Sequence, residues 1–166
     1  MKKLLVGLVV MLSLGATAQV KIGFVDAQRL LDTMPSRKGA AEKYMAQEKE
    51  AYAELQTMDT DLQKMIADYQ SKMKDMSPVL KESAERKITD KQRALQEREE
   101  IITQELQAYS NELNAPILKK VQDAVKTVSE RKKMTMVVDK STTLYYSPEF
   151  DITNEVGVEV MRLEKL

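Results

Sequence analysis

The sequence predicts a mainly helical α+β protein, in which a long antiparallel helical hairpin is inserted between short strands at the two ends of the chain. Charged residues make up 31 % of its 166 residues and aromatic residues only 5 %, a balance that suits long helical rods better than one large core. No glycine lies between Gly39 and Gly157. Apolar residues recur every seven positions over most of that span, which is the pattern of helices packed as a coiled coil. These observations predict an arm rather than a globule.

Residues 1–18 have the pattern of a secretory signal peptide. Two lysines precede an apolar run that ends at Ala16, and the sequence Ala-Thr-Ala at residues 16–18 has the form of a cleavage site. The run is short for a membrane span, so an uncleaved anchor is the less favoured alternative. The leader looks bacterial, and we expect a mature chain that starts at Gln19 and is exported to the periplasm.

The first strand is expected at residues 20–26 (VKIGFVD), where apolar and β-branched residues alternate with others. Asp26 is then placed to cap a short helix over residues 27–33. Pro35 and Gly39 are expected to mark a bend before the hairpin. Residues 19–39 therefore form the first part of a β-containing body.

Residues 40–133 are expected to form the hairpin arm. Ser77 and Pro78 interrupt the helical pattern, because the residue before a proline disfavours helix and a proline suits the first turn of a new one. The tip is therefore expected near Pro78. Residues paired across this tip have numbers that add to 156 or 157, so the two apolar stripes line up. The heptad positions are Leu55, Leu62, Tyr69 and Met76 before the tip and Ile88, Leu95, Ile102 and Tyr109 after it.

Pro116 lies in the second helix near the base of the arm. It removes one backbone hydrogen bond from the helix. Two interpretations stay open: a kink that steers the helix into the body, or a hinge.

Residues 134–166 are expected to complete the body. The alternation at residues 134–138 predicts a strand that ends at Asp139, and Leu144–Tyr146 are expected to form a third strand. Asp151 or Thr153 is placed to cap a last helix. The apolar residues Val156, Val160 and Leu163 share one face of that helix.

A body of this size is marginally stable alone, and a three-stranded sheet leaves two open edges. Lys91 and Arg98 also fall near the seam of the hairpin, so we expect the two helices to be only marginally stable without further contacts. We therefore expect a homo-oligomer held together at the body. The residues expected in that oligomerisation core are Ile22, Phe24, Met136, Val138, Leu144 and Tyr146.

The composition argues against several functions. The chain has no His and no Cys, which excludes imidazole acid–base catalysis, thiol nucleophiles and the usual zinc ligands. It has no Gly-rich loop that could hold phosphates. With 26 basic and 26 acidic residues it lacks the positive excess of a nucleic-acid-binding protein. We expect no enzymatic activity, no cofactor, no metal and no nucleic-acid partner.

Two segments carry a resemblance that covers the mature chain from end to end. KIGFVDAQRLL at residues 21–31 and MTMVVDKSTTLYYSPEFDIT at residues 134–153, on either side of a long charged hairpin, resemble the Skp/OmpH family of periplasmic chaperones. The resemblance implies a jellyfish-like homotrimer, in which the strands join in a central body and the helical arms enclose a cavity. It also implies an ATP-independent holdase that binds unfolded outer-membrane proteins and prevents their aggregation.

Apolar side chains on the arm are the candidate client contacts. Methionine suits a surface that must adapt to many partners, because its side chain is flexible and polarizable. The same positions also serve to fill the seam of the hairpin. Family members are often strongly basic, so the neutral charge of this chain gives little support to contact with membranes or lipopolysaccharide. The candidates are Met58, Met65, Met73, Met76, Val79 and Ile101.

A second function fits the same pattern. A structural coiled-coil scaffold or spacer of the cell envelope would oligomerise in the same way and would not suppress client aggregation.

Overall fold

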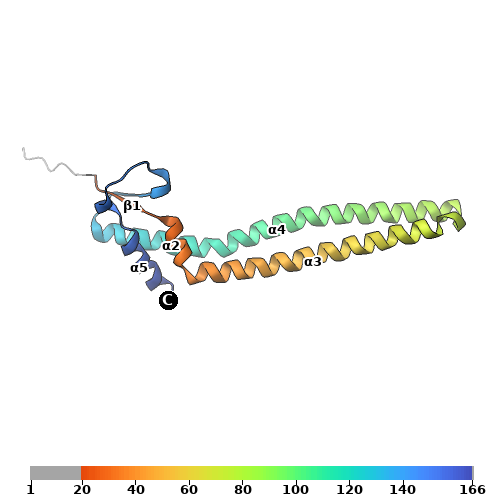
Figure 1. Cartoon of the computed structure of the whole chain (residues 1–166), viewed down its shortest axis with the longest axis horizontal. Helices are drawn as coiled ribbons and strands as arrows, with labels where there is room; N and C mark the ends of the chain where they lie inside the picture. The colour runs from red at the N-terminus through yellow and green to blue at the C-terminus, as the bar shows by residue number, and fades with distance from the viewer. Residues whose placement is uncertain (1–19, 166) are drawn as a thin grey trace, which may run out of the picture.

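The computed structural model describes residues 20–165, and the predicted signal peptide lies outside these residues. Strand β1 and helix α2 come first, followed by the two long helices α3 and α4, strand β2 and a last helix α5 (Figure 1). Short 3₁₀ turns cover residues 73–75, 140–142 and 148–150. The bounds are Ile22–Val25 for β1, Ala27–Thr33 for α2, Pro35–Lys72 for α3, Pro78–Lys132 for α4, Met136–Asp139 for β2 and Thr153–Leu163 for α5.

Helices α3 and α4 form the predicted hairpin, which projects from the body as a single arm (Figure 1). The 38 residues of α3 correspond to roughly 57 Å at 1.5 Å per residue. At the tip, Ser77 precedes α4 as its N-cap, and its Oγ accepts a hydrogen bond from the backbone N–H of Leu80. Pro78 is the first residue of α4, where its missing N–H costs nothing. The buried seam residues are Ala51 and Leu62 on α3 and Ile102 and Leu106 on α4.

The body is assembled from both ends of the chain around one apolar core. Strands β1 and β2 pair in parallel, and the whole arm serves as the connection between them. The last turns of α4 belong to this core, although the sequence boundary assigns them to the arm. The core residues are Val25, Leu30, Met34, Ile117, Val121, Ala124, Val128, Ile152, Val156 and Val160.

The structure corrects the sequence-based expectations at two places. Leu144–Tyr146 is not a strand, because within the described chain no neighbouring strand offers this segment a ladder of hydrogen bonds. The bend before the arm lies at Met34, whose backbone is extended, and α3 runs without interruption from Pro35 through Gly39. A single glycine weakens a helix without ending it when its neighbours are good helix formers.

Gly23 lets β1 approach Met134, which lies two residues before β2. A Cβ atom at position 23 would lie 2.4 Å from Sδ of Met134 and 3.3 Å from Cδ1 of Ile152. Any larger residue would require the Met134 side chain to move.

Candidate functional site

One face of the two-stranded sheet is apolar and is only partly covered by the rest of the described chain. The register pairs Ile22 with Met136 and Phe24 with Val138, so these four side chains share one face. Met136 is 55 % exposed and Ile22 is 36 % exposed, whereas Gly23 and Val25 on the opposite face are buried against the core. This outward sheet face contains four of the six residues that we expected in the oligomerisation core.

The segment at residues 143–147 extends the same apolar surface. The ring of Tyr146 stacks on that of Phe24 with centroids 5.1 Å apart, and Nζ of Lys140 lies 5.2 Å from the Tyr146 ring centroid. Leu144 is fully exposed and Tyr145 is 83 % exposed. An extended segment with uncovered apolar side chains, next to an open strand edge, is a surface suited to pairing with another chain.

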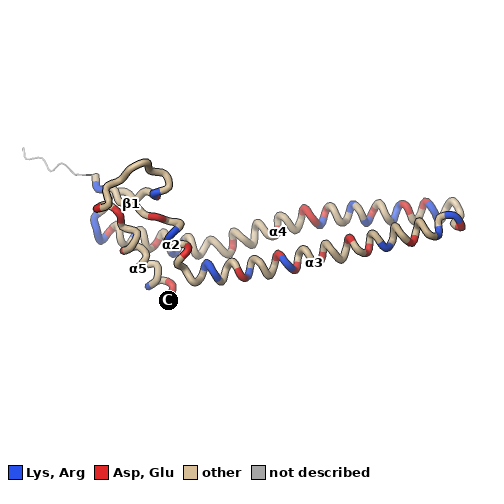
Figure 2. The backbone as a smooth tube through the Cα atoms, in the orientation of Figure 1, with Lys and Arg blue, Asp and Glu red and all other residues tan. Residues whose placement is uncertain are grey.

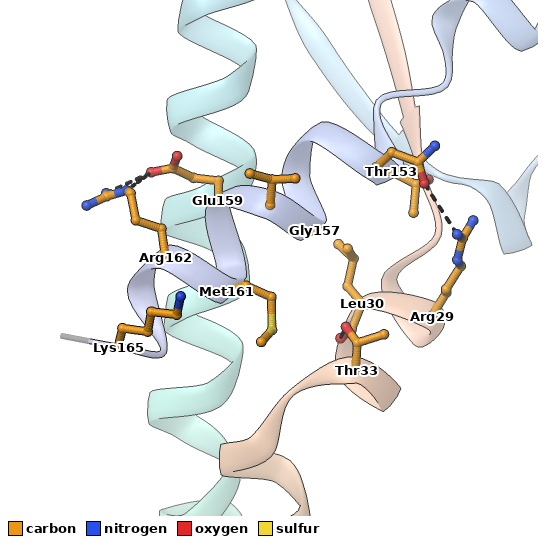
Figure 3. Close-up of a pocket in the computed structure, with 11 residues that line it drawn as sticks. Arg29, Leu30, Thr33, Thr153, Gly157, Glu159, Met161, Arg162 and Lys165 are labelled. Carbon is orange, nitrogen blue, oxygen red and sulfur yellow. Dashed lines mark hydrogen bonds and ion pairs between the residues drawn. The ribbon is translucent and has the colours of Figure 1, made fainter.

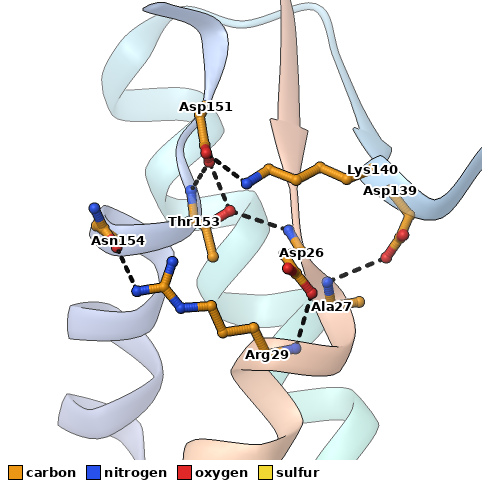
Figure 4. A network of polar contacts seen from close by, with 8 residues as sticks. All are labelled: Asp26, Ala27, Arg29, Asp139, Lys140, Asp151, Thr153 and Asn154. Carbon is orange, nitrogen blue, oxygen red and sulfur yellow. Dashed lines mark hydrogen bonds and ion pairs between the residues drawn. The ribbon is translucent and has the colours of Figure 1, made fainter. Parts of the chain in front are cut away.

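A network of polar contacts holds this surface to the core of the body (Figure 4). The backbone N–H of Asp26 donates to Oγ1 of Thr153 (3.0 Å), and that hydroxyl donates to Oδ1 of Asp151 (2.6 Å). The backbone N–H of Ala27 donates to Oδ2 of Asp139 (3.1 Å). Asp26 and Asp139, at the ends of the two strands, therefore hold the start of helix α2. Asp139 and Thr153 also join this helix start to the segments that follow β2 and precede α5.

The carboxylates of this network are stabilised in their charged form. Hydrogen bonds from Ser141, together with the N–H of Ala27, hold the pKa of Asp139 below its ordinary value. Burial raises the pKa of Asp151, but hydrogen bonds from Lys140 and Thr153 outweigh it and leave this pKa below its ordinary value of 3.8. Burial lowers the pKa of Lys140, and its contacts with Asp151 and Tyr146 outweigh that effect and raise it. All three groups act as structural charges here rather than as acids or bases.

The candidate client residues fall into two groups on the arm. Met58, Met65 and Met76 are half-buried in the seam between α3 and α4, where they contribute to the hairpin's own packing. Met73, Val79 and Ile101 are exposed, with exposed fractions of 40 %, 75 % and 45 %. Within the candidate set, only this second group presents its side chains mainly to solvent.

Sequence reasoning missed several other exposed apolar side chains. Leu80 at the tip is 59 % exposed. Tyr52 on α3 is also 59 % exposed, because Ala51 takes the buried position beside Ile102 and Leu106. Met45 lies seven residues before Tyr52, so the two share one face of α3. The spacing of seven between Met45 and Tyr52 was the available signal for a second, outward stripe.

Charges of both signs lie along the arm, most densely toward its tip (Figure 2). Several are paired within one helix, as Lys72 is with Asp68 and Arg86 is with Glu82. No single sign dominates a face of the arm in this view. The arm surface therefore consists of mixed charges with isolated apolar side chains between them.

A cavity of about 710 Å³ lies between α2 and α5 (Figure 3). Its polar side chains contact one another: Arg162 pairs with Glu159, and Arg29 donates to Asn154. Among residues 20–165, no three acidic side chains form a group that could hold a metal ion.

Within residues 20–165, no helix combines the length and the apolar character of a membrane span.

Comparison with known proteins identifies the family. Residues 21–160 match the family described as Outer membrane protein (OmpH-like). The chain belongs to the OmpH-like family. None of the curated proteins matches. A crystal structure of an OmpH-like outer membrane chaperone candidate from Caulobacter crescentus CB15 has the same fold, with a TM-score of 0.75 and 17 % sequence identity over 90 % of this chain and 89 % of that one.

The match to the OmpH-like family covers both halves of the body as well as the arm between them. It includes the strand pairs of the outward sheet face and the network residues Asp26, Asp139 and Asp151. The likeness to the solved structure at 17 % identity shows that the two chains share a fold although most of their residues differ.

Proposed function

We propose that this protein is an ATP-independent holdase chaperone of the periplasm that binds unfolded outer-membrane proteins. Membership in the OmpH-like family supports a chaperone role. The predicted signal peptide at residues 1–18 supports export. The observation that carries the proposal is the combination of a partly exposed apolar sheet face on the body with an arm of about 57 Å that projects from the same body (Figure 1).

We infer that chains associate through the outward sheet face, in the homotrimer that the family resemblance implies. An apolar face of this kind is stabilised when a second sheet or strand removes it from water. Because one arm projects from each body (Figure 1), association of the bodies brings several arms together around a common space. Unfolded clients would occupy that space.

The surface of the arm fits a client that is recognised by its general character. Unfolded barrel strands expose alternating apolar residues that aggregate through their edges. Isolated apolar side chains between solvated charges give many weak contacts and no strong one, which retains such a chain without selecting one sequence. The exposed apolar residues of the two long helices are Met45, Tyr52, Val79, Leu80, Ile101 and Leu118, and Met73 follows α3 at the tip.

The proposal is tested by diluting a urea-unfolded outer-membrane barrel protein into buffer with and without the mature chain, and following light scattering. We expect scattering to be suppressed, to saturate near one oligomer per client, and to be unchanged by ATP. Undiminished scattering, from a chain shown to be folded and oligomeric, would favour the envelope scaffold instead.

The association surface is tested separately by sedimentation. Met136→Glu places a charge in the centre of the outward sheet face, and we expect it to shift the chain toward the monomer. Val158→Glu is the matched control, because Val158 is 74 % exposed but lies on α5, away from that face. Equal sedimentation of the two variants would exclude the sheet face as the interface.

A further inference from the structure

The distal part of the arm, residues 63–101, has a less buried seam than the rest of the hairpin. Leu62 is the last buried residue of α3, and Ile102 is the first buried residue of α4. Between them, four heptad residues are only half-buried: Tyr69, Met76, Ile88 and Leu95. The packing of the two helices near the tip therefore depends on side chains that solvent also reaches.

Two methionines line the seam at this end of the arm. Met65 and Met76 are half-buried and border a pocket of about 290 Å³ between the two helices. The opposite side of the pocket is formed by Leu80, Ala84 and Ile88 of α4. Helix α4 contains no methionine, so the thioethers of this seam all come from the first half of the hairpin. The pocket is much larger than a molecule of hydrogen peroxide and gives a small solute access to both methionine side chains.

Thioether sulfur is the group of this chain that peroxides oxidise most readily, because the chain has no cysteine. A lone pair of the sulfur attacks one oxygen of hydrogen peroxide, the O–O bond breaks and an S–O bond forms. The departing hydroxide takes the proton of the transferred oxygen and becomes water. The sulfur loses two electrons and the peroxide gains them. A polar sulfoxide then replaces a flexible apolar side chain.

We propose that Met65 and Met76 form an oxidation-sensitive site near the tip of the arm, at which hydrogen peroxide weakens the packing of α3 against α4. A sulfoxide oxygen in the half-buried seam lacks hydrogen bonds to water unless the helices separate. Both apolar clusters of the described chain lie on the body side of Leu62, so they stabilise the remainder of the molecule but not this end. The site is a property of the single chain and does not rest on the proposed function.

Two other methionines serve as internal controls. Met45 is 66 % exposed on α3, so peroxide reaches it while its side chain lies mainly in solvent. Met34 is 2 % exposed in the body core and should stay unmodified. Met45 thus separates oxidation as such from oxidation in the seam, and Met34 reports whether the body stays folded during the treatment.

Peptide mass spectrometry and amide hydrogen exchange of the peroxide-treated protein test the site. We expect sulfoxides at Met65 and Met76. Exchange of the amides in residues 63–95 should become about fivefold to tenfold faster, the factor that corresponds to the lower end of the cost of an unpartnered polar group. Amides of the body core should keep their rates. Treatment with the two methionine sulfoxide reductases, with dithiothreitol as the reductant, should restore the slower exchange.

Two variants separate the seam methionines from the others. Met65→Leu/Met76→Leu keeps the seam apolar and removes both sulfur atoms, so its exchange in residues 63–95 should not respond to peroxide. Met45→Leu is the matched control on the same helix and should respond as the unmodified chain does. Circular dichroism before treatment confirms that each variant is folded.

Three results would overturn the proposal. The first is unmodified Met65 and Met76 under conditions that oxidise Met45 completely. The second is sulfoxide at both seam positions with unchanged exchange in residues 63–95, and the third is equal protection by Met45→Leu. All three are read without any client, so they are independent of the aggregation assay.

Discussion

The guanidinium of Arg98 on α4 donates to both carboxylate oxygens of Glu54 on α3, with Nε–Oε1 2.8 Å and Nη2–Oε2 2.9 Å apart. Arg98 also donates to Glu105, seven residues further along α4 (3.0 Å). These hydrogen bonds raise the pKa of Arg98 and lower that of Glu54. The pair is a polar fork at the exposed edge of the apolar seam, and it joins the two helices at this level.

We expect replacement of this fork to change the stability of the helical hairpin only slightly. We expect Arg98→Leu alone to lower the thermal midpoint by no more than about 3 °C, because an ion pair near the surface contributes little net free energy. The double variant Arg98→Leu/Glu54→Leu should recover the loss, since apolar contacts then replace the pair. Thermal denaturation followed by circular dichroism measures both. A double variant less stable than the single one would contradict this account.

Gly23→Ala should destabilise the body by about 1–3 kcal/mol, the usual cost of overpacking a core. The new methyl group would meet Sδ of Met134 at 2.4 Å. Adding Met134→Ala to the same chain makes room for the methyl group, so the double variant should lose less than the sum of the single variants. Urea unfolding of the four chains measures this coupling. Strictly additive losses would show that the close approach to Met134 is not the cause.

The body should lose stability in acid through the Asp151 network. Because the pKa of Asp151 is lowered in the folded chain, its carboxylate stabilises the fold above its ordinary value of 3.8, and this contribution is lost as the pH falls through the lowered pKa. Asp151→Asn should therefore reduce the fall in unfolding free energy between about pH 5 and pH 3. Asp61→Asn, at an exposed position on the arm, is the control and should retain the fall seen in the unmodified chain. Identical pH profiles for all three chains would rule out this role.

Helix α5 offers a matched pair of valines for testing the body core. Val156 is fully buried, whereas Val158 is 74 % exposed on the same helix. We expect Val156→Ala to cost about 1.5–3 kcal/mol, from lost apolar burial and the cavity it leaves. Val158→Ala should change the unfolding free energy by less than about 0.5 kcal/mol. Urea denaturation distinguishes them, and similar losses in both would mean that α5 packs differently.

The exposed tip should contribute to client retention. Val79 and Leu80 are 75 % and 59 % exposed at the start of α4. Changing both to Ser should raise the chaperone concentration needed for half-suppression of aggregation by about threefold to tenfold, because each side chain supplies a weak apolar contact. Val158→Ser on the body is the control and should have no effect in this light-scattering assay. A tip variant equal to the unmodified chain would move the client contacts to other parts of the arm.

Local patterns in the sequence account for most of the correct expectations. Asp26 was expected to cap the short helix, and its Oδ1 accepts from the backbone N–H of Arg29 as a capping residue should. The heptad spacing paired Leu55 with Ile102, and the two residues lie in one apolar cluster of the arm. Arg98 was expected near the seam, but its partner Glu54 lies 44 residues away and has no local signature.

The expectations that failed depended on neighbours in space. Leu144–Tyr146 has the composition of a strand, but a strand also requires a partner, and the described chain provides none at that position. Tyr52 matched the apolar spacing, yet the smaller Ala51 faces the partner helix, because a close approach of two helices favours small side chains at the contact.

By itself the sequence determined the helical hairpin, its tip at Ser77 and Pro78, and the Asp26 cap, because these follow from spacing and from residues a few positions apart. Only the tertiary structure decided that β1 and β2 pair in parallel, that their outward face stays partly exposed, and that Glu164 meets Ser36 and Lys120 at the base of the arm. Ser36 and Glu164 are 128 residues apart. Contacts over such separations depend on how the whole chain packs, and no local pattern of residues encodes them.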